Sequence, residues 1–275
     1  MTVASQIKGA VHTAVRHDSA GNHVSGRSVF IDDMPELAGT LHAVLVKSPH
    51  AHAMIKSIHT TSATSLGGVH AVLTAADIPG TNDVAPIFEN EPVLAVDEVQ
   101  YVGHPVAVVM AETMDIARQA AEQVAVDYEP LAAILSIEEA LKGQYFTSEK
   151  QIMKRGDAQG AIKGATHRIS GSVSCGGQDH FYLEGHIALT VPQEDNDMLV
   201  YSSTQHPTEV QHGVATVLGV PVNAVTTETR RMGGGFGGKE SQSTIIAALA
   251  ALGANATRRP VKLRLTRDDD MVITG

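Results

Sequence analysis

The stretch RRMGGGFGGKES, residues 230–241, holds the residue types and spacing best suited to chemistry. Gly233 followed by Gly238-Lys239 matches most of a phosphate-binding P-loop, and Gly233, Gly235 and Gly238 also match G-x-G-x-x-G. Glycine lets the backbone approach a ligand closely, and N–H groups at the start of a helix converge on an anion. The first question is therefore whether this loop binds a nucleotide.

The residues around the loop argue against both nucleotide motifs. A P-loop needs a hydroxyl after its lysine, but Glu240 stands there, and its carboxylate would repel phosphates. The acid that ends the next predicted strand, Asp268, lies 30 residues after Gly238, where a dinucleotide site expects about 20. A third option is a loop that lays its backbone on another anionic cofactor, with Phe236 projecting and Glu240 presented to a substrate.

Composition excludes some classes of function. The 275 residues, 43% of them hydrophobic, are enough for one large globular domain or two ordinary ones. The net charge of −10 argues against a nucleic-acid partner, which needs cations for its phosphates. The start of the chain has no signal-peptide pattern, and the most apolar run, residues 245–254, is too short to cross a bilayer. We therefore expect a cytoplasmic protein without a membrane partner.

The single cysteine, Cys175, limits redox chemistry within the chain. One thiol cannot form an internal disulfide or supply the several thiolates of an iron–sulfur cluster. Any such cluster must therefore lie on another chain. We expect Cys175 itself to be a small buried hydrophobic residue.

The first part of the chain reads as an α+β unit. A helix capped by Thr113 lies between two predicted strands, which suggests a βαβ-type unit, and Ser136 opens another short helix. Residues 142–165 lose periodicity, so we place a domain boundary there. The predicted strands of this part are 40–48, 69–74, 105–110 and 124–129.

The second part is expected to place the glycine loop between a strand and a helix. A helix should run from Pro207 to Gly219, and a run of turn residues, 194–197, predicts a hairpin. The acids Asp268, Asp269 and Asp270 are predicted to be a solvated strand end. The other predicted elements are strands over 167–174, 181–193, 198–204, 223–231 and 261–270, and a helix over 241–253.

Two separate motifs resemble one protein family. GGGFGGKE is similar to the molybdopterin-binding loop of the xanthine dehydrogenase and aldehyde oxidase family, and CGGQDHFYLEG, residues 175–185, resembles its upstream signature. Within the family, the large, molybdenum-binding subunit of bacterial xanthine dehydrogenases is most similar. The resemblance implies an α+β fold, with an α/β-hammerhead domain over residues 1–145 and the beginning of the molybdenum cofactor-binding domain over 146–275.

The resemblance also implies roles for single residues. Gln178 would lie beside an oxygen ligand of the molybdenum, and the backbone at Phe236 and Gly237 would approach the metal centre, without any direct protein ligand. Glu240 would bind the purine ring of the substrate. The resemblance implies two further residues that permit the close approach of the loop, Gly234 and Gly235. His180 and Glu184 are expected to pack near the cofactor.

The reaction implied by the resemblance is oxidation of hypoxanthine and xanthine to urate, with water as the oxygen source. Electrons would pass through [2Fe-2S] clusters and FAD to NAD, on partner subunits or domains of a hetero-oligomer. The general base is expected beyond residue 275, so no catalytic residue is assigned in this chain. The chain would hold only part of the molybdopterin site, and we expect it to be inactive alone.

Two alternatives remain at this point. The chain can belong to a related hydroxylase of aldehydes or N-heterocycles, or it can be a non-catalytic truncated subunit. Glu240 favours the purine, because a carboxyl group bonds to ring N–H or carbonyl groups, and a site built for polar partners rejects analogues that lack them.

Overall fold

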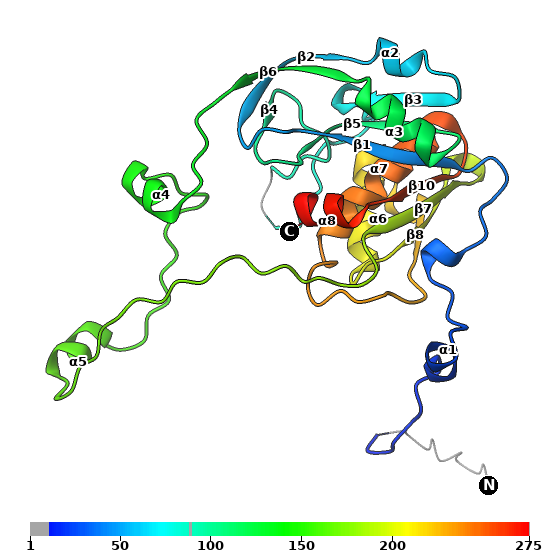
Figure 1. Cartoon of the computed structure of the whole chain (residues 1–275). Coiled ribbons are helices and arrows are strands. Elements are labelled where there is room, and N and C mark those ends of the chain that lie inside the picture. Colours follow the sequence, from blue (N-terminus) through cyan, green and yellow to red (C-terminus); the bar gives the residue numbers. More distant parts are fainter. Residues whose placement is uncertain (1–10, 88–89, 275) are drawn as a thin grey trace, which may run out of the picture.

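Two β-sheets organise the chain in the computed structural model, which describes residues 11–87 and 90–274 (Figure 1). Residues 1–10 and residue 275 lie outside this description. The prediction that no signal peptide is present concerns the first of these segments and is not tested by the structure. The larger sheet has the order β3 (Val69–Thr74), β5 (Pro105–Ala111), β1 (Leu41–Lys47), β10 (Val261–Arg264), β7 (Ile187–Pro192), β8 (Met198–Ser202), β9 (Val225–Glu228). The smaller sheet has the order β4 (Glu98–Val99), β2 (Ala53–His59), β6 (Ala125–Pro130).

The larger sheet joins the two predicted parts of the chain. Strand β1 pairs in parallel with β10, which comes from the far end of the sequence, and Leu41 lies opposite Val261. Strand β10 in turn pairs antiparallel with β7, so strands of both parts share one hydrogen-bonded sheet. The predicted boundary at residue 145 stays a prediction.

Both faces of the larger sheet are covered, which explains the uninterrupted apolar sequence of β5. Val108 and Met110 point into a core shared with α6 (Pro207–Leu218) and α7 (Gln242–Thr257). Ala107 and Val109 point into a second core, which contains α3 (Met114–Glu122) and residues of the smaller sheet. Every residue of β5 is buried.

The helix signals in the sequence are confirmed. The Thr113 hydroxyl accepts a hydrogen bond from the Ile116 N–H at 3.2 Å and so caps α3. Pro207 occupies the first position of α6, and Gly219, with a φ of 66°, ends it. The apolar run 245–254 lies in α7, whose residues from Ser243 to Ala254 are all buried. Among the described residues, no helix has the length and apolarity needed to cross a membrane.

No βαβ unit forms around α3, so that prediction is wrong. Strands β5 and β6 flank α3 but belong to different sheets, because β6 pairs with β2. A parallel unit does form elsewhere, where α6 connects the parallel neighbours β8 and β9. The hairpin β7–β8 is confirmed, with its antiparallel register running from Ala188 opposite Ser202 to Pro192 opposite Met198.

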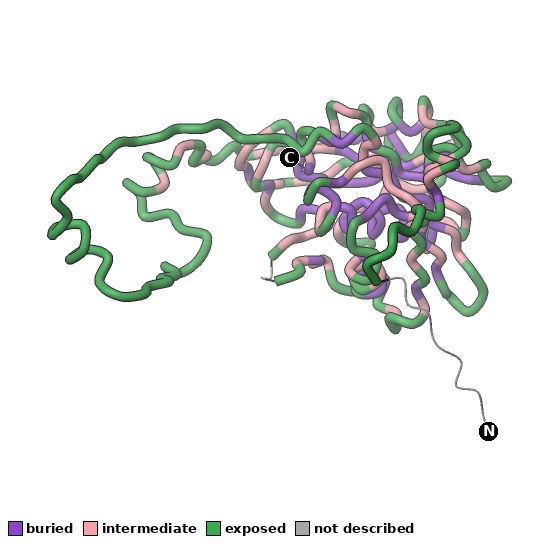
Figure 2. The backbone as a smooth tube through the Cα atoms, turned by 90° about the horizontal axis from the view of Figure 1, so that it is seen from below, coloured by how far each residue is buried: buried purple, intermediate pink, exposed green. Residues whose placement is uncertain are grey.

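The segment between β6 and β7 extends away from the body of the molecule and carries α4 (Ile137–Gly143) and α5 (Ala158–Gly164) (Figures 1 and 2). Residues 167–174 are exposed and form no strand, so that prediction is wrong, because alternation alone does not supply a partner strand. Cys175 is also exposed, contrary to expectation. The remaining helical elements are short: α1 (Ala20–Val24), η1 (Ile31–Asp33), α2 (Thr61–Thr64), η2 (Ala75–Asp77), η3 (Glu194–Asn196), η4 (Val222–Ala224) and α8 (Arg267–Ile273).

Candidate functional site

The glycine loop connects β9 to the buried helix α7, as the sequence predicts. A turn closes it, in which the Gly238 N–H donates to the Gly235 carbonyl at 2.8 Å. Gly234 and Gly237 have φ values of 98° and 100°, which residues other than glycine rarely adopt. Phe236 also has a positive φ, 58°, and its side chain is 75% exposed. The loop is therefore held in a backbone conformation that projects Phe236 outward.

Several loop N–H groups find no acceptor among the residues that the structure describes. Among the described residues, the amides of Gly234, Gly235 and Phe236 donate no hydrogen bond. Neighbouring amides of the same loop are fully used, since Gly233, Gly237 and Gly238 all donate within the protein. Successive unpaired backbone N–H groups in a glycine-rich turn form a concave site for an anion.

The side chain of Gln205 hydrogen-bonds to the loop, a role that the sequence did not predict. Its side-chain Oε1 accepts hydrogen bonds from the Gly237 N–H at 2.8 Å and the Lys239 N–H at 3.3 Å. A Cβ atom added at Gly235 would lie 2.5 Å from this same oxygen, so the glycine permits the close contact. Gln205 lies in STQHP, directly after β8, where no local sequence pattern indicates a contact with the loop.

Gln178 occupies a different environment. It lies on the exposed segment before β7, where its amide donates to the carbonyl of the adjacent Gly177 at 3.2 Å. Among the described residues, no hydrogen bond joins Gln178 to the loop. Its role beside the metal stays a prediction that rests on the resemblance. The amide that this geometry brings to the loop is that of Gln205.

Glu184 and Lys239 form a buried ion pair at the base of the loop. The Lys239 side chain is fully buried, and its Nζ donates to the Ser203 hydroxyl at 2.8 Å and to Glu184 Oε2 at 3.3 Å. Burial lowers the pKa of Lys239, although the Glu184 carboxylate opposes this shift. His180 also lies beside the loop, 2.8 Å from a Cβ added at Gly238. That His180 and Glu184 pack near the cofactor stays a prediction.

The predicted solvated strand end at residues 268–270 is wrong. Strand β10 stops at Arg264, and the three acids lie in the first turn of α8, where the helix dipole favours them. Asp270 is only 1% exposed. One of its carboxylate oxygens accepts hydrogen bonds from the Tyr182 hydroxyl, at 2.8 Å, and from Thr274, at 2.7 Å, and lies 2.8 Å from His186 Nδ1.

The hydrogen bonds decide the protonation of this acid. Burial by itself would raise the pKa of Asp270, but the hydrogen bonds and charge of His186, with those of Thr274 and Tyr182, hold the pKa well below its usual range. The same acid accepts the His186 backbone N–H through its other oxygen at 2.8 Å. Asp270 thus ties α8 to the segment that precedes β7.

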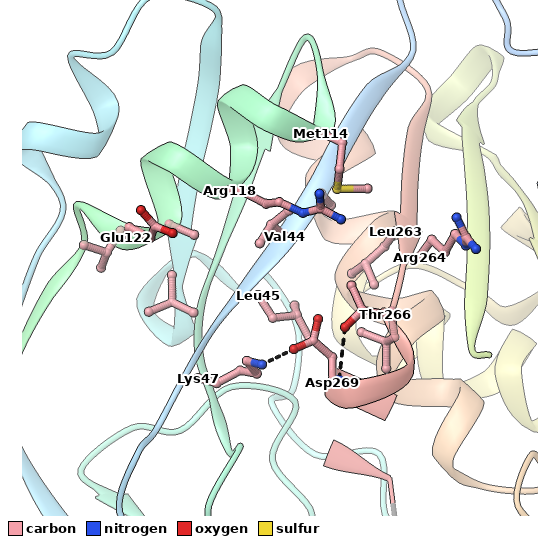
Figure 3. A pocket seen from close by; sticks show the side chains of 15 residues that line it. Val44, Leu45, Lys47, Met114, Arg118, Glu122, Leu263, Arg264, Thr266 and Asp269 are labelled. Carbon is pink, nitrogen blue, oxygen red and sulfur yellow. Dashed lines mark hydrogen bonds and ion pairs between the residues drawn. The ribbon is translucent and has the colours of Figure 1, made fainter. Parts of the chain in front are cut away.

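A hollow of about 500 Å³ lies at a separate place, between α3 and the strands β1 and β10 (Figure 3). Lys47 and Asp269 form an ion pair across it, and the Asp269 N–H donates to the Thr266 hydroxyl at 3.1 Å. The loop contributes no residue to its described lining. With Lys47 and Asp269 already paired to each other, we assign this hollow no ligand.

Comparisons with known proteins match both parts of the chain. The model of the aldehyde oxidase and xanthine dehydrogenase a/b hammerhead domain matches residues 25–132, and that of the molybdopterin cofactor-binding domain matches residues 140–275. Xanthine dehydrogenase/oxidase of Mus musculus is 42% identical over 94% of this chain. Xanthine dehydrogenase of Oryza sativa is 44% identical over 97%, and aldehyde oxidase 2 of Cavia porcellus is 42% identical over 96%. The chain spans about a fifth of the length of these relatives.

Solved structures agree with the sequence relatives. Quinoline 2-oxidoreductase of Pseudomonas putida 86 is 28% identical with a TM-score of 0.80, covering 96% of this chain and 35% of that one. The aldehyde oxidoreductase of Desulfovibrio gigas is 29% identical with a TM-score of 0.80, covering 94% and 30%.

The fold is therefore that of a molybdopterin-binding oxidoreductase, in which a hammerhead domain precedes a molybdenum cofactor-binding domain. The chain belongs to the xanthine dehydrogenase and aldehyde oxidase family of molybdenum hydroxylases.

Proposed function

We propose that this chain is part of a molybdenum hydroxylase that oxidises hypoxanthine and xanthine to urate, with water as the oxygen source. The observation that carries the proposal is the loop itself. Among the described residues, three successive loop N–H groups donate no hydrogen bond, and the side chain of Glu240, four positions after Phe236, is exposed. The cradle suits an anionic cofactor, and the carboxyl group one position beyond the buried Lys239 suits a polar heterocycle.

The residues of the loop fit molybdopterin, and we propose that they hold part of it. The backbone of Gly234, Gly235, Phe236 and Gly237 would lie against the cofactor, which when bound supplies the oxidation chemistry at the substrate carbon. The Gln205 Oε1 accepts from the loop, and its Nε2, which donates no hydrogen bond among the described residues, is proposed to donate to this ligand. The general base is proposed to come from outside residues 1–275.

The electron path is proposed from the family. The one cysteine of the 275 residues cannot bind a [2Fe-2S] cluster, so clusters and FAD would lie on other domains or subunits, with NAD as acceptor. We propose that the FAD-binding and iron–sulfur components are separate subunits of a hetero-oligomer.

Comparing Gln205 with an exposed glutamine tests the cofactor assignment. We expect Gln205→Ala to lower the molybdenum content of the purified enzyme about tenfold, because it removes the acceptor of two loop N–H groups. Gln151→Ala, on the exposed segment between β6 and β7, is the matched control and should leave the content unchanged. Metal analysis by mass spectrometry gives the answer. An unchanged content in Gln205→Ala would contradict the assignment of Gln205, while Gln178 stays a proposed neighbour of the metal.

Replacing Glu240 tests the substrate assignment. We expect Glu240→Ala to lower kcat/KM for xanthine about a hundredfold and that for benzaldehyde less than threefold, because only the purine offers ring N–H and carbonyl groups to the carboxyl group. The ratio of the two activities is the measurement, at equal molybdenum content.

A second candidate function is supported by the neighbours. Aldehyde oxidase 2 and the quinoline and aldehyde oxidoreductases share the fold, so a hydroxylase of aldehydes or N-heterocycles is the alternative. Equal losses on xanthine and benzaldehyde in Glu240→Ala would favour it over the purine enzyme.

A further inference from the structure

The two ends of the glycine loop meet at a single carboxylate oxygen. Glu184 Oε2 accepts the N–H of Gly233, the first glycine of the loop, at 2.8 Å. The same oxygen lies 3.3 Å from Nζ of Lys239, the residue that follows the last glycine. The Ser203 hydroxyl, at the end of β8, bonds to both partners, at 2.5 Å and 2.8 Å. We call these three side chains the loop clamp.

The loop clamp is buried. Because burying charged groups costs free energy, a pairing without a role would be unfavourable. The exposed fraction of the Lys239 side chain is 0% and that of Glu184 is 13%. Removing two charges from water is expensive, and apolar residues of similar volume often serve stability equally well. The ring of Tyr182 lies 4.7 Å from Nζ of Lys239 and adds a cation–π contact. A buried pair with this many partners fixes one geometry of the chain it joins.

Two consecutive residues at the end of the loop differ completely in exposure. Lys239 is fully buried in the clamp, whereas Glu240, the next residue, is exposed. The Lys239 carbonyl is also held, since it accepts hydrogen bonds from the Gln205 N–H at 2.8 Å and from Ser243 at 3.1 Å. With Lys239 anchored on both sides, the direction of Glu240 is set by the clamp.

We propose that Glu184 and Lys239 are positioning residues, which order the whole glycine loop and aim Glu240 at the substrate. The aim at a purine rests on the proposed function, while the ordering of the loop does not. Apart from the turn at Gly238 and the two amides bonded to Gln205, the loop has little support, because its glycines contribute no side chains and Phe236 is exposed. The clamp therefore supplies order that the loop sequence lacks.

Hydrogen exchange of single loop amides tests the ordering. In Lys239→Met we expect the protection of the Gly233, Gly237 and Lys239 amides to fall about tenfold or more, while amides of the β7–β8 hairpin keep theirs. The Gly237 amide donates to Gln205 and not to a residue of the clamp. A loss confined to Gly233, or no loss, would overturn the proposal. If Lys239→Met does not fold, Glu184→Gln, which retains an acceptor for Gly233, decides by the same criterion.

Kinetics of the complete enzyme separate this proposal from the proposed function. We expect Glu184→Gln to raise KM for xanthine about tenfold with a smaller change in kcat, since a mis-aimed Glu240 weakens binding. Lost amide protection with an equal rise of KM for benzaldehyde would support the clamp and contradict the purine assignment. Unchanged protection would refute the clamp, whatever the substrate.

Discussion

Replacing Gly235 by alanine is expected to lower turnover of the enzyme about a hundredfold, the size of effect that a displacement of 1 Å near a reacting centre produces. The added Cβ would lie 2.5 Å from Oε1 of Gln205, far inside van der Waals contact. Gln205 cannot turn away without releasing the Gly237 and Lys239 amides. The loop must therefore shift, and the three N–H groups without protein acceptors shift with it.

Gly171→Ala is the matched control for this prediction. A Cβ at Gly171 meets nothing within 4 Å, and the residue lies on the exposed segment before β7. Turnover and molybdenum content should both stay at the wild-type level in this variant. Wild-type turnover in Gly235→Ala would show that the close contact with Gln205 has no role in the site.

Replacing Asp270 by asparagine should produce the largest loss of stability, about 3–5 kcal/mol, the range found when one partner of a buried charged network is removed. Asp270 is 1% exposed and accepts from Tyr182, Thr274 and the backbone of His186. Asn keeps the size of the side chain but loses the charge and one acceptor. Asp268→Asn, on the exposed face of the same helical turn, should change stability by less than about 0.5 kcal/mol.

The pH dependence of this difference follows from the pKa of Asp270. The hydrogen bonds hold the folded pKa below the unfolded value of about 4, so the folded state favours the charged carboxylate. This contribution is complete above pH 4 and is lost as the pH falls through the folded pKa. Urea denaturation of wild type and Asp270→Asn should therefore give curves that differ at pH 7 and converge toward pH 2. A constant difference would contradict the assignment.

Local signals in the sequence predicted the elements that depend on local physics. Thr113, Pro207 and Gly219 act through contacts within one turn of a helix, and the structure confirms all three. The 194–197 turn brings β7 and β8 together for the same reason. Apolar composition likewise located α7, because a helix that is buried on all sides needs no periodicity.

Features that depend on distant partners could not be predicted in this way. Asp270 is buried because Tyr182 and His186, some 85 positions away, supply donors, and a run of three acids contains no sign of them. Residues 167–174 have the alternation of a strand but no neighbour to pair with. Gln205 looks like an ordinary loop residue until the fold places it under Gly235. The glycine spacing and the family resemblance indicated the loop itself. The contacts of Gln205 with it became clear only from the structure.

The parallel pairing of β1 with β10 has a consequence for synthesis of the chain. Leu41 and Val261 are 220 positions apart, and β1 has no neighbour on that side until β10 emerges. At ribosomal rates of about 5–20 residues per second, this takes roughly 10–40 s. During that time β1 exposes an unpaired, apolar edge, which is a template for pairing with other chains. Newly made chains are thus expected to be vulnerable to aggregation through this edge until β10 is translated, when a chaperone would have the most to protect.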